Sequence, residues 1–193
     1  MNLPNQLTLA RFVLALLFVA TLSFSFPYSR TLALLLFSTA ALTDFLDGHL
    51  ARKYGLITNF GKLMDPLADK VLMCAGFVMM VELRLIEGWI IIIILSREFL
   101  VTGLRLVASS EGKVLAAESL GKHKTTWQIV TLIYFLLLLA SSEPAFAWIR
   151  PAFRTPLTAP PILGTLLVGF SLLLTLWSGF AFAIRNRALL VPE

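Results

Sequence analysis

Long apolar segments separated by short polar ones dominate this sequence. Windows long enough to cross about 30 Å of hydrocarbon occur six times along the chain. They are residues 7–26, 31–51, 66–84, 88–108, 124–142 and 163–184. A segment of this length satisfies its backbone hydrogen bonds within itself as a helix. The pattern therefore predicts an all-α integral membrane protein with six transmembrane helices.

The connections between these windows are mostly short. Residues 54–61 carry glycine and turn-forming residues, which predicts a tight connection between the second and third helices. Residues 141–161 form the longest part without hydrophobic periodicity, and we expect an external loop of partly interfacial character there. No room is left for a separate soluble domain, so residues 1–193 are expected to form a single transmembrane domain.

The composition is that of a membrane protein, and the charge favours anionic lipids over nucleic acid as partners. Hydrophobic residues make up 58% of the chain and charged residues 14%, with a mean hydropathy of +0.86, outside the range of soluble globular proteins. The net charge of +5 suits anionic lipid head groups. Nucleic acid is not expected as a partner, because no basic, aromatic-interleaved soluble segment exists to bind it. Cys74 is the only cysteine, which excludes an intrachain disulfide.

The basic residues flanking the windows predict the orientation of the chain. With a cytoplasmic N-terminus, eight of them fall on the cytoplasmic side and four on the other. The first group is Arg52, Lys53, Lys62, Lys113, Lys122, Lys124, Arg185 and Arg187, and the second is Arg30, Arg84, Arg150 and Arg154. We therefore expect both termini in the cytoplasm. A signal peptide at the first window is disfavoured, since no small-residue cleavage site follows it.

All four aspartates of the chain fall between residues 44 and 69. Asp44 and Asp47 are spaced i, i+3 near the end of the second window, and Asp65 and Asp69 are spaced i, i+4 around the start of the third. On a helix each pair shares one face. Four carboxylates at membrane depth repel one another and are costly to desolvate, so cations are expected between them. Oxygen ligands favour Mg²⁺, Mn²⁺ or Ca²⁺.

The residues around these aspartates resemble the signature of a known family. Asp44, Asp47, Gly48, Ala51, Arg52, Gly61, Asp65 and Asp69 follow the pattern D-x2-D-G-x2-A-R-x8-G-x3-D-x3-D. This is similar to the signature of the CDP-alcohol phosphotransferases. The resemblance extends from Asn2 to about Gln128 and more loosely beyond. It implies a six-helix membrane enzyme, usually a homodimer, that joins a CDP-linked lipid to an alcohol and releases CMP.

The resemblance also implies roles for individual residues. Asp44, Asp47, Asp65 and Asp69 would bind two divalent cations, Mg²⁺ or Mn²⁺, which neutralise a diphosphate and its leaving group. Asp69 would also be the catalytic general base that deprotonates the alcohol. Gly48 and Ala51 would let the CDP-lipid lie close to the second helix, and Arg52 would contact its phosphates. The site would face the cytoplasm. His49 is assigned no role.

Two further segments bear on the acceptor alcohol. Arg97, Glu98 and Arg105 interrupt the fourth window, Lys122 precedes the fifth, and Lys124 is the first residue of the fifth. Residues 97–105 and 121–128, together with residues 2–11, resemble the bacterial members of the family that use sn-glycerol 3-phosphate. CDP-diacylglycerol would be the donor, bound with help from Asn5, Thr8 and Arg11. Arg105, Lys122 and Lys124 would hold the acceptor phosphate, which places the acceptor pocket between residues 97 and 128.

Several alternatives stay open at this point. The lysines could serve only the orientation of the chain, Arg97 and Glu98 could form a structural ion pair, and Asn5 and Thr8 could cap the first helix. The acceptor could be serine, inositol or phosphatidylglycerol. A cation transporter could also use an acidic cluster, although it gives no reason for the spacing of Gly48, Ala51 and Arg52.

Overall fold

A computed structural model describes the backbone of residues 3–54, 59–110, 119–154 and 160–186, and within these the side chains of residues 9–43, 67–68, 70–109, 123–153 and 162–186. Every predicted window coincides with a helix, and no described residue lies in a strand. The helices are α1 (Leu3–Ser23), α2 (Ser29–Tyr54), α3 (Asn59–Glu82), α4 (Gly88–Ser110), α5 (Ser119–Ala140) and α6 (Thr165–Arg185). The all-α prediction is confirmed.

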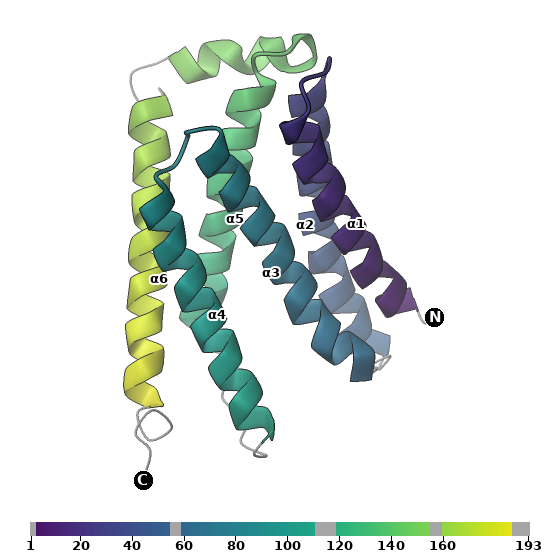
Figure 1. Ribbon diagram of the computed structural model, residues 1–193, viewed down its shortest axis with the longest axis vertical. Coiled ribbons are helices and arrows are strands. Elements are labelled where there is room, and N and C mark those ends of the chain that lie inside the picture. Colours follow the sequence, from purple (N-terminus) through teal and green to yellow (C-terminus); the bar gives the residue numbers. More distant parts are fainter. Residues whose placement is uncertain (1–2, 55–58, 111–118, 155–159, 187–193) are drawn as a thin grey trace.

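The helices form one elongated bundle (Figure 1). Helix α1 packs along α2 and α3, whereas α6 packs on α5 and α4. Helix α5 also contacts α2 and thereby joins the two groups. Helix α2 ends, and α3 begins, at the end of the bundle where α4 also ends (Figure 1). We call this the acidic end, because the second half of α2 and the first half of α3 carry the four aspartates.

The interior is packed with aromatic and aliphatic side chains. Phe18 of α1 and Phe37 of α2 are fully buried, and their ring centroids lie 5.5 Å apart. Gly76 allows α3 to approach α5 closely, because a Cβ at this position would lie only 2.7 Å from Leu132 Cδ1. A larger residue at position 76 would therefore force the Leu132 side chain to shift or the two helices to separate.

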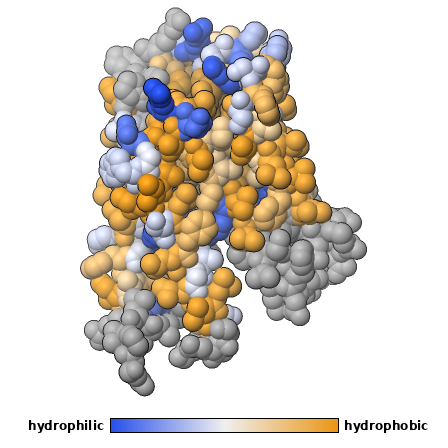
Figure 2. Space-filling view, viewed as in Figure 1, coloured by the Kyte–Doolittle hydropathy of each residue, from blue (hydrophilic) through white to orange (hydrophobic). Residues whose placement is uncertain are grey.

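Helix α6 has a polar inner face and an apolar outer face. Its buried residues include Ser171 and Thr175, whose hydroxyls meet α5. Thr131 Oγ1 lies 2.9 Å from Ser171 Oγ, and Gln128 donates to Thr175 Oγ1 at 3.2 Å. The outer face is strongly exposed, with Trp177 at 65%. Apolar surface extends over much of the bundle in Figure 2. Hydroxyl-rich contacts between helices and apolar outer faces are typical of helices in a membrane.

Two described stretches are long and apolar enough to cross a membrane, Ile162–Arg185 and His123–Ala140. Leu9–Ser23 and Ser29–Thr43 are apolar but shorter. Six windows were predicted, but only the first two of these described stretches meet the criteria for a membrane span. Charges explain part of the difference, because α4 carries Arg97, Glu98 and Arg105 within its length. The number of membrane spans, six, remains a prediction.

The segment at residues 141–161, predicted as a loop without periodicity, is helical over much of its length, whereas its external position stays a prediction. A 3₁₀-helix, η1 (Pro144–Arg154), lies across the end of the bundle opposite the acidic end (Figure 1), and a short π-helix, η2 (Pro160–Gly164), leads into α6. Phe146 and Phe153 pack against the core. Pro151 within η1 cannot donate a backbone hydrogen bond. A 3₁₀-helix has about three residues per turn, and this one contains a proline, so its sequence does not show the 3.6-residue periodicity of an α-helix.

Glu143 links η1 to the start of α2. Its carboxylate accepts hydrogen bonds from the backbone N–H groups of Arg30, at 2.9 Å, and Thr31, at 2.8 Å. These are unpaired donors of the first turn of α2, so Glu143 acts as its cap from 112 residues away. Burial acts to raise the pKa of Glu143, but the hydrogen bonds from Thr31 and Arg30 outweigh it and lower the pKa below its ordinary value of 4.5.

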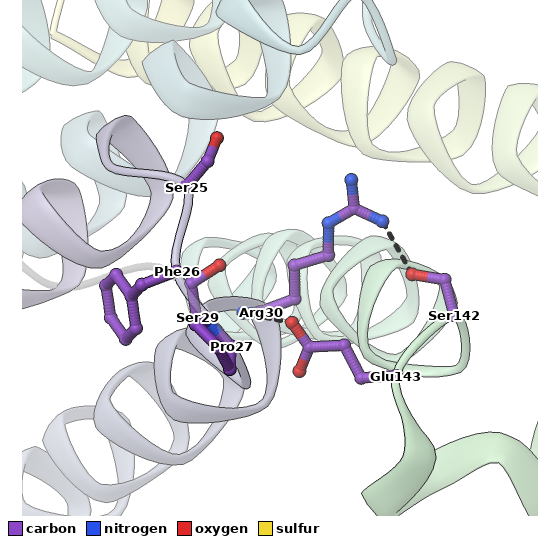
Figure 3. A pocket seen from close by; sticks show the side chains of 7 residues that line it. All are labelled: Ser25, Phe26, Pro27, Ser29, Arg30, Ser142 and Glu143. Atoms are coloured by element: carbon purple, nitrogen blue, oxygen red, sulfur yellow. Dashed lines mark hydrogen bonds between the residues drawn. The ribbon is translucent and has the colours of Figure 1, made fainter.

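A cavity of about 450 Å³ opens beside this contact and is lined by Glu143, Arg30, Ser142 and residues of the α1–α2 turn (Figure 3). The Arg30 side chain extends to Ser142 and donates a hydrogen bond to its hydroxyl at 2.5 Å. The contact therefore joins the α1–α2 turn, α2 and the end of α5. It closes the η1 end of the bundle.

Helix α3 ends in a Schellman motif around Arg84. The Arg84 N–H donates to the carbonyl of Val81 at 2.9 Å, and the Leu85 N–H donates to that of Met80 at 2.9 Å. Arg84 has a φ of 56°, in the left-handed region that glycine adopts most readily. The motif terminates α3 and turns the chain into α4, with some backbone strain at Arg84.

Candidate active site

The acidic signature is divided between two consecutive helices. Asp44 and Asp47 lie in the second half of α2, and Asp65 and Asp69 lie in the first half of α3. The two helices contact each other. The side chains of the four aspartates lie outside the described side chains, so their orientation and their predicted role as metal ligands remain predictions.

The backbone register places the aspartates at matching depths. Asp44 precedes the end of α2 at Tyr54 by as many residues as Asp69 follows the start of α3 at Asn59. At 1.5 Å per residue, both Cα atoms lie about 15 Å along their helices from the acidic end. Asp47 and Asp65 lie nearer that end, each about 10 Å along its helix. This donor set, made only of carboxylates on neighbouring helices, suits hard divalent cations.

Arg11 is the one member of the predicted CDP-lipid set whose side chain is described. It lies on α1, which begins at the acidic end (Figure 1), and is only 2% exposed. Helix α1 packs on both α2 and α3, so this permanently charged side chain is buried on the helix that packs against the two helices that carry the aspartates. The side chains of the other members lie outside the described set: Asn5, Thr8, Gly48, Ala51 and Arg52.

A second polar cluster joins α3, α4 and α5. The Glu98 side chain on α4 is 10% exposed and contacts three cations. Lys70 Nζ of α3 donates to Glu98 Oε2 at 2.9 Å, and Lys124 Nζ of α5 donates to Oε1. Arg97 Nη1 lies 3.6 Å from Oε1. We call these four side chains the Glu98 cluster.

The predicted acceptor-phosphate residues divide between two environments. Lys124 is buried, with a side chain 4% exposed, and belongs to the Glu98 cluster. Arg105 lies two turns along α4, where its guanidinium carbon is 5.8 Å from the centre of the Phe182 ring on α6, within reach of a cation–π interaction. The Lys122 side chain lies outside the described set. The structure therefore brings Lys124 to Glu98, whereas Arg105 faces α6.

Sequence reasoning assigned no role to Lys70, which the structure places against Glu98. The signal was present, because Lys70 directly follows Asp69 inside an otherwise apolar segment. A lysine inside such a segment is expected to have a charged or polar partner in the bundle. Its partner could not be identified from sequence, since the contact between α3 and α4 arises only in the folded bundle.

Comparisons with known proteins show the family of this chain. The family model described as CDP-alcohol phosphatidyltransferase matches residues 1–177. The chain belongs to the CDP-alcohol phosphatidyltransferase family. The matched residues include the whole acidic signature and the Glu98 cluster.

Members of the CDP-alcohol phosphatidyltransferase family from several bacteria are similar to this chain. A Bacillus subtilis protein named CDP-diacylglycerol--glycerol-3-phosphate 3-phosphatidyltransferase is 44% identical over 148 residues, covering 70% of this chain and 77% of that protein. A Rickettsia bellii protein of the same name is 40% identical over 136 residues, covering 70% and 75%. A Rickettsia felis protein of that name is 33% identical over 181 residues, covering 94% and 93%.

Proposed function

We propose that this chain transfers the phosphatidyl group from CDP-diacylglycerol to sn-glycerol 3-phosphate, giving phosphatidylglycerophosphate and CMP. This is the reaction of a phosphatidylglycerophosphate synthase in phospholipid biosynthesis. Family membership supports the reaction class, and the names of the Bacillus subtilis and Rickettsia relatives support the two substrates. The observation that carries the proposal is the acidic signature, held at matching depths on α2 and α3 within the residues matched to the family.

In the proposed reaction, Asp69 accepts the proton of the glycerol 1-hydroxyl. The hydroxyl oxygen forms a bond to the phosphorus that carries diacylglycerol, and the bond from that phosphorus to the oxygen of CMP breaks. Asp44, Asp47, Asp65 and Asp69 would hold Mg²⁺ or Mn²⁺, which supplies charge neutralisation at the diphosphate and the leaving group. Two ions fit four carboxylates better than one.

Binding residues follow from the same proposal. Arg11, Asn5 and Thr8 would hold the CDP end of the donor against α1, and Arg52 would contact its phosphates beside Gly48 and Ala51. Lys122, Lys124 and Arg105 would contact the phosphate of the acceptor. The position of Arg11 supports its assignment, because it lies on α1, which packs on both α2 and α3.

We further propose six membrane spans, formed by α1 to α6, with both termini and the acidic end in the cytoplasm of a bacterial inner membrane. The excess of Lys and Arg near that end supports this orientation. Residues 1–193 would form a single catalytic domain that works as a homodimer.

The test is CMP release by the purified protein in lipid nanodiscs with Mg²⁺ and CDP-diacylglycerol. Glycerol 3-phosphate, inositol, serine and phosphatidylglycerol are offered in separate reactions. We expect CMP release with glycerol 3-phosphate alone. Release with another alcohol would overturn the proposed acceptor and keep the reaction class. No release with any of the four would overturn the enzyme proposal, and cation flux in liposomes would then be measured.

A further inference from the structure

Glu98 is the point at which α3, α4 and α5 meet through charge. Its two carboxylate oxygens are divided between helices, with Oε2 bound to Lys70 of α3 and Oε1 bound to Lys124 of α5. Both lysine side chains are mostly buried, at 20% and 4% exposure. Because each oxygen binds one ammonium, a single carboxylate fixes the separation of two cations from different helices.

Glu98 places two ammonium groups, those of Lys70 and Lys124, on either side of one carboxylate. Cations buried in a helix bundle favour anionic partners. Each ammonium has three N–H donors. A phosphate can therefore bind both lysines without breaking their bonds to Glu98.

Arg97 differs from the two lysines in its surroundings. Its side-chain Cγ lies 3.0 Å from the place where a Cβ at Gly179 of α6 would be. The absence of a side chain at Gly179 thus makes room for the stem of Arg97 between α4 and α6. Arg97 has a packing role in the bundle, whereas Lys70 and Lys124 meet Glu98 where α3 and α5 face α4.

Two members of the Glu98 cluster are close in sequence to residues of the proposed active site. Lys70 directly follows Asp69 on α3, so a shift of Lys70 along the helix axis moves Asp69 with it. Lys124 lies in the first two turns of α5, within residues 121–128, one of the segments that resemble the family members that use glycerol 3-phosphate. A bond from Glu98 to both lysines therefore couples the position of the proposed base to that of the proposed phosphate ligands.

We propose that Glu98 is a positioning residue for the acceptor: it holds Lys70 and Lys124 together so that the phosphate of glycerol 3-phosphate meets two fixed ammonium groups. This inference rests on the proposed function, and it adds Lys70 to the residues that contact the acceptor phosphate. Without the carboxylate, the two lysines repel each other and separate. The acceptor then binds less well, while the CDP-lipid, which is proposed to bind along α1 and α2, is affected little.

The experiment measures KM for each substrate separately in Glu98→Gln and Glu98→Asp. We expect Glu98→Gln to raise the KM for glycerol 3-phosphate about tenfold or more, the loss typical of one charge-assisted contact, with less than a twofold change in the KM for CDP-diacylglycerol. Glu98→Asp keeps the charge and should recover part of the loss. Glu143→Gln is the matched control, because Glu143 also joins distant elements but lies at the η1 end. It should leave both KM values unchanged.

A purely structural role gives a different result. If Glu98 only stabilised the bundle, Glu98→Gln would lower the amount of folded enzyme and leave both KM values unchanged in the folded fraction, which would overturn the inference. If Glu98→Gln does not fold, Lys70→Met replaces it, since that change keeps the pair between Glu98 and Lys124. The same selective rise in the KM for glycerol 3-phosphate is expected, and its absence would count against the proposal.

The two proposals fail in distinguishable ways. If the wild-type protein uses a neutral alcohol and not glycerol 3-phosphate, the proposed function fails before any variant is made. If the wild type uses glycerol 3-phosphate and Glu98→Gln raises both KM values equally, only the role of Glu98 fails.

Discussion

Two glutamates tie distant parts of this bundle together, and they do so by opposite means. Glu98 is buried among three cationic side chains from α3, α4 and α5. Glu143, at the η1 end, accepts two backbone N–H groups at the start of α2. Backbone donors are present whatever the side chains are, so the contact of Glu143 needs only the fold. The contact of Glu98 needs particular cations, which suggests that those cations have a use beyond the fold.

The largest expected effect lies at the acidic end and tests its catalytic role. Asp69→Asn removes the proposed base without changing the size of the side chain, and turnover should fall by about 10²–10⁴-fold, the range for loss of a general base. Thermal unfolding in detergent should be unchanged within a few degrees. Retained turnover in this variant would show that Asp69 is not the base.

Glu98→Ala and Glu143→Ala compare the two glutamates directly. Glu98→Ala leaves buried cations uncompensated and should lower the free energy of unfolding by about 3 kcal/mol or more. Glu143→Ala removes a cap and should lower it by about 1 kcal/mol. Denaturation of the purified variants in mixed micelles measures both. Equal losses would contradict the distinction between a charge cluster and a backbone cap.

The pH dependence of the η1 end follows from the lowered pKa of Glu143. A carboxyl whose pKa is lower in the folded state stabilises the fold above its unfolded value, here 4.5, and this contribution is lost as the pH falls through the lower folded value. Wild-type protein should therefore lose stability below about pH 4.5 by more than Glu143→Gln does. Thermal unfolding of the two proteins between pH 3 and pH 7 tests this, and parallel curves would exclude the contribution.

The smallest expected effect is a gain in stability at the α3–α4 turn, away from both Glu98 and Glu143. Arg84→Gly places glycine at the left-handed position of the Schellman motif and should raise the free energy of unfolding by up to about 1 kcal/mol. Activity per folded molecule should not change, because the α3–α4 turn lies away from the acidic end. A loss of stability would show that the Arg84 side chain contributes more than its backbone strain costs.

The sequence predicted the helices well and their contacts poorly, for a physical reason. Hydropathy located each of the helices α1 to α6, because long apolar segments have few alternatives to a helix. The signature predicted which helices carry the aspartates, and the backbone register agrees with a shared depth. The sequence offered Arg97 as an ion-pair partner of Glu98, and the two side chains lie 3.6 Å apart. Lys70 and Lys124, which reach Glu98 from other helices, were not predicted as its partners. Contacts between helices depend on packing, which no local pattern records.

The Glu98 cluster also bears on how the chain enters the membrane during synthesis. Helix α4 emerges after α3 and before α5, so Glu98 and its neighbour Arg97 reach the bilayer when Lys70 is available and Lys124 has not yet been made. An unassisted α4 is poorly suited to lipid, because charged residues near the centre of a helix oppose insertion. We expect α4 to remain close to α3, or to the insertion machinery, until α5 arrives. In the proposed six-span arrangement, the fifth helix would thus complete the insertion of the fourth.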